Sequence, residues 1–132
     1  MGSRKRLRAE KIKEEKQQTS FAKLNNCPSS PRKMRLMADN IRGLDVFQAM
    51  AILQNSPQAA AKNLNKLLRS AMANWEAKNE GARPEESNLF VKEVTVDSAR
   101  MLKRIQPAPQ GRAHRIRKRS NHVTLVIDSA AK

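Results

Sequence analysis

Apolar residues recur at helical spacing in the first half of the chain. Met34, Met37 and Ile41 lie three or four positions apart, as they would on one face of a helix. The Ser-Pro pair at 30–31 places a capping hydroxyl before a proline that suits the first helical position. Gly43 favours termination of this helix. The pattern predicts a helix that begins at the proline and ends before this glycine.

Two further helices are expected before residue 81. Asp45 is placed to cap a short helix that includes Val46 and Leu53. A second Ser-Pro pair at 56–57 repeats the start pattern, and a long helix should follow up to about Asn79. The apolar face of this long helix comprises Ala60, Ala61, Leu64, Leu67, Leu68, Ala71, Met72 and Trp75.

The period of the apolar positions changes to two in the last third of the chain. Alternation over 89–97 and again over 122–127 predicts two strands, and a short extended segment is expected at 20–26. Between the two strands lies the polar stretch 98–121, with a turn at 107–111 that contains two prolines and one glycine. These features predict one long antiparallel hairpin, whose outer arms project because they have few apolar residues to bury.

The predicted fold is therefore α+β, with three helices packed on a small antiparallel sheet and a long protruding β-hairpin. Residues 19–128 should form a single domain that includes the hairpin arm 98–121, and 129–132 should be a short tail. Residues 1–18 form a basic N-terminal extension. This extension is rich in helix-forming residues but has no apolar stripe, so it is expected to be an exposed helix or a disordered tail that becomes ordered on RNA.

Charge separates the chain into three parts. The net charge is +15, with 27 Lys and Arg against 12 Asp and Glu. Residues 1–36 and 98–132 each carry a net +8, whereas 37–97 carry −1, and no carboxylate occurs between Ser98 and Ile127. Such basic ends favour a polyanionic partner. No long apolar run predicts a membrane span or a secretory signal, and one cysteine cannot form an internal disulfide.

RNA binding is the chemistry that the basic residues favour. Guanidinium groups bind phosphate bidentately, and no aromatic residue on the arm is available for base stacking, so recognition of folded RNA through its backbone is expected. No acid–base pair, phosphate-binding glycine loop or four-ligand metal site is evident, so catalysis, cofactors and metals are not expected. The expected RNA contacts are Lys23, Arg32, Lys33, Arg35, Arg100, Lys103, Arg104, Arg112, His114, Arg115, Arg117, Lys118 and Arg119.

Several segments resemble the bacterial large-subunit ribosomal protein twenty-two family. The matching segments are Ser30–Leu36, Ala38–Gly43, Ala71–Asn74, Lys103–Pro107 and Gly111–Ile116. The resemblance covers about residues 20–128. It implies a cytoplasmic protein of the large ribosomal subunit that binds large-subunit ribosomal RNA and neighbouring ribosomal proteins, supports assembly, and meets the nascent peptide in the exit tunnel with its hairpin tip.

The tip departs from the family pattern. Family members commonly carry basic residues there, whereas this chain has Ala108 and Gln110. An uncharged turn that contains two prolines suits a rigid wall beside a solvent-filled passage better than a phosphate contact. The expected tunnel tip comprises Gln106, Pro107, Ala108, Pro109, Gln110 and Gly111.

Two other functional classes were weighed. An architectural DNA-binding protein also uses β-ribbon arms with a proline near the tip, but such arms usually belong to dimers that need an exposed apolar face. An RNA-modifying enzyme would need a cofactor loop or an acid–base pair. RNA binding as a structural protein is the preferred interpretation.

Overall fold

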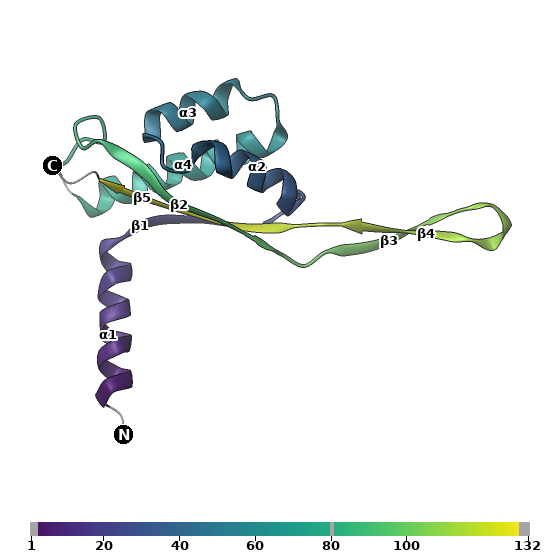
Figure 1. The fold of residues 1–132 in the computed structure, drawn as a ribbon, viewed down its shortest axis with the longest axis horizontal. Coiled ribbons are helices and arrows are strands. Elements are labelled where there is room, and N and C mark those ends of the chain that lie inside the picture. Colours follow the sequence, from purple (N-terminus) through teal and green to yellow (C-terminus); the bar gives the residue numbers. More distant parts are fainter. Residues whose placement is uncertain (1–2, 80, 130–132) are drawn as a thin grey trace.

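The computed structural model describes residues 3–79 and 81–129 (Figure 1). Its elements in chain order are α1 (Ser3–Gln18), β1 (Ser20–Cys27), α2 (Pro31–Ile41), α3 (Val46–Asn55), α4 (Ala59–Lys78), β2 (Leu89–Ser98), β3 (Leu102–Pro107), the 3₁₀ turn η1 (Pro109–Gly111), β4 (Ala113–Lys118) and β5 (Asn121–Ser129). The predicted α+β class is confirmed. Of the predicted tail at 129–132, Ser129 lies in β5 and the rest falls outside the described residues, as do residues 1–2 of the extension.

The body of the molecule is a three-stranded antiparallel sheet in the order β1-β5-β2, with α2, α3 and α4 on one side and α1 on the other (Figure 1). Leu125 at the centre of β5 pairs with Ala22 of β1 and Val94 of β2. All three are buried together with the inward faces of the helices. The prediction of three helices packed on a small sheet is confirmed.

The sheet contains β-bulges that the sequence analysis did not predict. Val91 pairs with Ile127 and Glu93 with Val126, so one extra residue sits in β2 between these pairs. The next buried residue after Val91 is Val94, three positions on instead of two. The bulge restores the alternation, because an extra residue moves the following side chains to the other face of the strand.

The outer edge of β2 is covered by the side chains of Arg35 in α2 and of Arg42, which directly follows α2. Arg35 donates from Nε and Nη2 to the carbonyl oxygen of Val96, at 3.2 and 3.0 Å. Arg42 donates from Nη2 to the carbonyl oxygen of Val94 at 2.9 Å and pairs with Asp39 at 2.7 Å. These bonds occupy carbonyl groups that an edge strand would otherwise present for pairing with another chain.

The helix starts agree only partly with the predictions. The Asp45 carboxylate accepts hydrogen bonds from the backbone amides of Phe47 and Gln48, so its predicted capping role is confirmed. The prediction that the long helix begins at the second Ser-Pro pair is wrong, since α4 begins two residues later at Ala59. The Ser56 hydroxyl instead donates to the carbonyl oxygen of Ile52, in the last turn of α3. Ser56 directly follows the end of α3 at Asn55. Ser30 occupies the N-cap position of α2, but its hydroxyl makes no capping bond to the described residues.

The α1 helix stands apart from the core. None of its residues, Ser3–Gln18, is buried, and the ion pair between Arg6 and Glu10 is internal to the helix. The extension is therefore an exposed helix in this structure, the first of the two expected states.

Deleting residues 1–18 is expected to leave the free energy of unfolding of the body within about 0.5 kcal/mol of the full chain, because exposed residues without tertiary contacts contribute little. Thermal unfolding of both forms measures this. A fall of many degrees in the midpoint would show that α1 packs against the body in solution.

Candidate nucleic-acid interface

The basic arm is a ribbon of its own, formed by β3 and β4 as a separate two-stranded antiparallel sheet. It extends far beyond the body, as Figure 1 shows. Its register joins Leu102 to Lys118 at the base and Pro107 to Ala113 near the turn. The ribbon is taken here as residues 102–118.

The predicted long antiparallel hairpin is confirmed, but its ladder is broken where the body sheet meets the ribbon. Ser98 pairs with Asn121, and Leu102 pairs with Lys118. Three residues, 99–101, in the outgoing arm therefore lie opposite two residues, 119–120, in the returning arm. One hydrogen bond, from Ala99 to the Ser120 carbonyl at 2.9 Å, bridges this junction. The unequal segment lengths break the ladder, as a bulge does.

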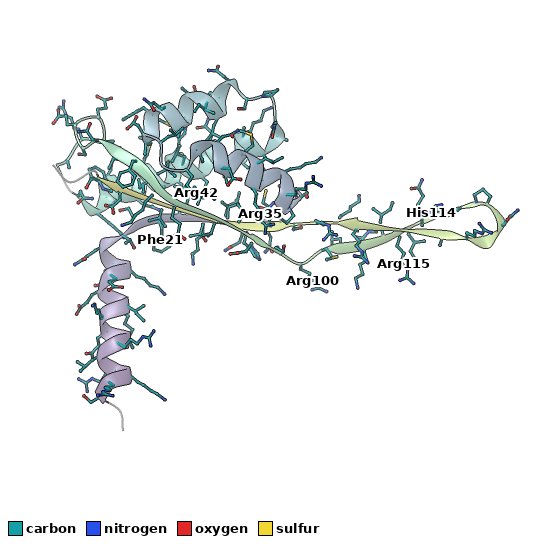
Figure 2. All side chains as sticks on the ribbon, in the orientation of Figure 1. Phe21, Arg35, Arg42, Arg100, His114 and Arg115 are labelled. Atoms are coloured by element: carbon teal, nitrogen blue, oxygen red, sulfur yellow. The ribbon has the colours of Figure 1, made fainter. Side chains whose placement is uncertain are left out.

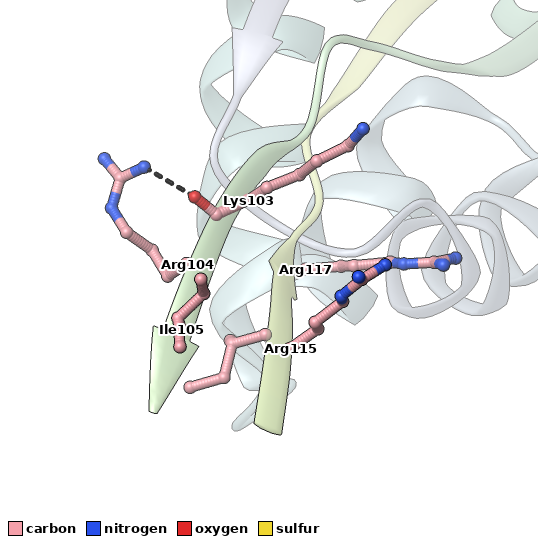
Figure 3. Close-up of a pocket in the computed structure, with 6 residues that line it drawn as sticks. Lys103, Arg104, Ile105, Arg115 and Arg117 are labelled. Atoms are coloured by element: carbon pink, nitrogen blue, oxygen red, sulfur yellow. Dashed lines mark hydrogen bonds between the residues drawn. The ribbon is translucent and has the colours of Figure 1, made fainter. Parts of the chain in front are cut away.

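Both faces of the ribbon are basic. Directly paired residues of an antiparallel ladder share a face, so Lys103, Arg117 and Arg115 lie together with Ile105 on one side. Figure 3 shows Lys103, Arg115 and Arg117 extending to one side of the strands, with Arg104 on the other.

The second face carries Arg104, Lys118 and His114, paired with Ile116, Leu102 and Gln106 respectively. The Arg104 guanidinium is held beside the strand by a 2.9 Å bond to the Lys103 carbonyl oxygen. A hollow of about 350 Å³ lies at the middle of the ribbon, beside the three pairs from Lys103 with Arg117 to Ile105 with Arg115. Cations therefore point outward in two opposite directions from one narrow scaffold.

Apolar side chains on the ribbon remain exposed in the free protein. Ile105 is 69% exposed, Leu102 50% and Ile116 37%. A two-stranded ribbon without further packing is marginally stable in water. In the described part of the chain, these side chains and the neighbouring cations have no third layer packed on them.

Other predicted contacts gather at the base of the ribbon. Arg100 lies at the bend between body and ribbon, as Figure 2 shows, and Arg119 lies across the junction from it. Arg32 and Lys33 are exposed on the first turn of α2. That turn is tied to the ribbon base because the buried Asn121 side chain donates to the Ser29 carbonyl oxygen at 2.8 Å.

Two of the predicted RNA contacts, Arg35 and Lys23, do not lie on the ribbon, and the side chains of both interact with other parts of the body. The Arg35 guanidinium is bonded to the edge of β2, so this arginine has a role in the fold itself. Lys23 lies on β1 of the body, with its ammonium 5.6 Å from the centroid of the Phe21 ring. Lys78 of α4 approaches the same ring at 5.8 Å. Lys78 was not expected near Lys23, because only tertiary structure brings α4 beside β1.

The turn at the end of the ribbon is tight and uncharged. The Ala108 amide donates to the Arg112 carbonyl oxygen at 2.9 Å, which closes the turn. Gln110 and Gly111 both adopt positive φ values, +61° and +70°. Glycine takes this conformation without a steric penalty, which agrees with the role expected for Gly111.

The two histidines are not arranged for catalysis. His114 is exposed on the ribbon, and His122 accepts a hydrogen bond at Nδ1 from the Asn26 backbone amide at 3.0 Å. Within residues 3–79 and 81–129, no group of three or more His, Cys, Asp or Glu side chains is placed to hold a metal ion. The described helices include none with the length and apolarity needed to cross a bilayer.

One ion pair joins the edge strand β2 to the central strand β5, away from the ribbon. Lys92 of β2 donates to the Asp128 carboxylate of β5 at 2.7 Å. This hydrogen bond and the attraction of the carboxylate raise the pKa of Lys92 above its ordinary value of 10.5. Lys92 is thereby paired within the body, in contrast to the ribbon cations.

Hydrogen exchange is expected to separate body from ribbon in the free protein. Amides of the β5 core positions, such as Leu125, should exchange slowly, and those over 102–118 much faster, because the ribbon opens without exposing the core. Exchange monitored by NMR or mass spectrometry checks this. Equal protection of both regions would contradict an independently opening ribbon.

Comparison with known proteins gives a consistent result. The family model described as Ribosomal protein L22p/L17e matches residues 22–128. The chain is 68% identical over 127 residues to the large ribosomal subunit protein uL22 of Christiangramia forsetii, which covers 96% of this chain and 94% of that protein. It is 58% identical over 132 residues to the uL22 protein of Parabacteroides distasonis, which covers 100% of this chain and 96% of that protein.

Proposed function

The chain belongs to the ribosomal protein L22p/L17e family, and we propose that it binds large-subunit ribosomal RNA with its ribbon and lines the nascent-peptide exit tunnel with its tip. It is a structural constituent of the large ribosomal subunit in the cytoplasm and not an enzyme. Membership of the family implies ribosomal RNA and other ribosomal proteins as partners.

The observation that carries the RNA-binding proposal is the charge of the ribbon on both faces. Lys103, Arg115 and Arg117 point one way and Arg104 with Lys118 the other, and the stretch from Ser98 to Ile127 has no carboxylate. Phosphates bound on both sides would release counterions, so binding should be strong and dependent on salt.

The ribbon is therefore suited to lie between RNA segments, with RNA supplying the layer that the two strands lack. Arg32 and Lys33 at the ribbon base would extend the contact onto the body, near the positive end of α2. The exposed Lys23 and the cations of α1 add positive charge on the other side of the sheet. RNA contact by these residues is part of the proposal.

Binding to large-subunit RNA in the presence of duplex DNA tests this function. A structural RNA-binding protein should prefer the folded RNA at every salt concentration, because its cations are spaced along a stiff ribbon that suits neighbouring RNA backbones. Equal competition by duplex DNA would favour the alternative of an architectural DNA-binding protein.

The tip proposal rests on the contrast between the shaft and the turn. The shaft carries a cation in most of its pairs, whereas residues 106–111 carry no charge. Pro107 and Pro109 restrict the backbone, and each removes an amide donor. A stiff turn with few polar groups suits the wall of a passage through which the nascent peptide must move without adhering.

Replacing Ala108 and Gln110 with lysine is expected to leave subunit assembly intact and to alter the passage of some nascent chains, since like charges in the wall oppose basic segments. The control replaces the same residues with Ser and Asn, which add no charge. Sedimentation measures assembly, and translation of chains with basic and neutral segments measures passage. A structure of the assembled subunit with the tip packed against phosphates and no open channel beside it would refute the tip proposal alone.

A further inference from the structure

A groove lies between α3 and α4. Figure 1 shows both helices on the side of the sheet opposite α1. It consists of two hollows of about 350 and 370 Å³ that share Met72 and Glu76. The first extends to Met50 and Arg69, and the second to Phe47, Arg83 and Glu85. These residues define the α3–α4 groove, and Arg69 lies at the end away from Phe47.

The floor of the α3–α4 groove is apolar and adaptable. Phe47 is 38% exposed, and Met50 and Met72 are half-buried against the core. Methionine side chains are flexible and polarizable, so they adjust to the shape of an inserted group. Hollows of this size hold one or two side chains of a partner rather than an extended surface.

The charge at the Phe47 end of the groove differs in sign from that of the ribbon. Glu76, Glu85 and Arg83 line this end, and among the described residues neither glutamate forms an ion pair, whereas Arg83 lies 4.0 Å from the Glu86 carboxylate. The lining here therefore holds two acids and one base, and the base is paired with a third acid, in a chain whose net charge is +15. A phosphate backbone would be repelled here, whereas a lysine or arginine would be attracted.

We propose that the α3–α4 groove docks a neighbouring protein of the large subunit, through an apolar side chain flanked by Lys or Arg. The apolar side chain would insert between Phe47 and Met72, and the flanking cation would meet Glu76 and Glu85. Aromatic and methionine anchors with a charged rim are the composition of protein–protein contacts. RNA is disfavoured because the same carboxylates oppose its phosphates.

Photo-crosslinking in purified large subunits tests the proposal. Subunits are assembled with benzoylphenylalanine in place of Phe47, which retains an aromatic ring in the groove. The expected product joins this position to a peptide of another subunit protein that contains Lys or Arg next to an apolar residue. A parallel variant with the same photo-reactive residue in place of Ile105 should crosslink to RNA. Failure of that second crosslink would count against the ribbon proposal and not against the groove.

Charge reversal adds a matched comparison. The double variant Glu76→Lys and Glu85→Lys in the Phe47 photo-reactive chain should lower the protein crosslink about tenfold, because like charges then face each other across the contact. The control variant Glu14→Lys and Glu15→Lys makes the same charge change on the exposed α1 helix and should leave the crosslink unchanged.

Three results would overturn the proposal. The first is crosslinking of the Phe47 position to RNA, to a second copy of this chain, or to nothing at all. The second is an unchanged crosslink after charge reversal at Glu76 and Glu85. The third is an equal loss in the α1 control, because the effect would then come from net charge and not from the groove.

Discussion

Replacing Arg104, Arg112 and Arg115 with glutamine is expected to weaken binding to large-subunit RNA by roughly 10²–10³-fold at low salt, from three lost charged contacts. The slope of log affinity against log salt concentration should fall by about two to three units. The body should remain folded, because these side chains are exposed and the ribbon has its own ladder. Filter binding over a salt series measures both quantities.

The control for this variant removes the same charge elsewhere. Lys62, Lys66 and Arg69 lie exposed on α4 and are not among the expected RNA contacts. Replacing them with glutamine should change affinity only slightly. An equal loss in both triple variants would mean that net charge alone governs binding and that the ribbon has no special place in it.

Replacing Leu125 with alanine is expected to lower the free energy of unfolding by about 2–5 kcal/mol. Leu125 is 0% exposed at the centre of the middle strand, so truncation leaves a cavity between the sheet and the helices. Urea unfolding followed by fluorescence of Trp75, the one tryptophan of the chain, measures the change.

The same substitution on the ribbon provides the comparison. Leu102→Ala removes an identical group from a residue that is 50% exposed, and it should cost less than about 0.5 kcal/mol. Similar losses at the two positions would mean that the ribbon is packed as firmly as the core in the free protein. A negligible loss at Leu125 would contradict the assigned core.

Hydrophobic periodicity was enough to predict most elements, since burial on one face fixes the spacing of apolar residues. It predicted α2 from Met34, Met37 and Ile41, whereas the bulge at the three-residue step from Val91 to Val94 was not predicted. The long arm was predicted from the polar stretch 98–121, which has few apolar residues and a central turn. These features depend on local sequence and net charge.

Features that depend on distant contacts were not predictable. The bonds from Arg35 and Arg42 to β2 join residues more than fifty positions apart, so Arg35 was expected only as an RNA contact and no role was predicted for Arg42. Ser56 looked like a helix cap, but its hydroxyl bonds backward to the preceding helix. The break at 99–101 escaped notice because polar residues carry no alternation from which an extra residue could be counted.

The separate ladder of the ribbon makes its length independent of the body. In every pair from Leu102 with Lys118 to Pro107 with Ala113, both residues belong to the ribbon. An added pair would therefore disturb no hydrogen bond of the body sheet. Each added pair would move the tip outward by about 3.4 Å. It would also move every side chain beyond it to the opposite face of the ribbon, and a second added pair would return those side chains to their original face. Tolerated changes of length should therefore come in steps of two pairs, about 7 Å each, so that the tip advances while every cation keeps its side.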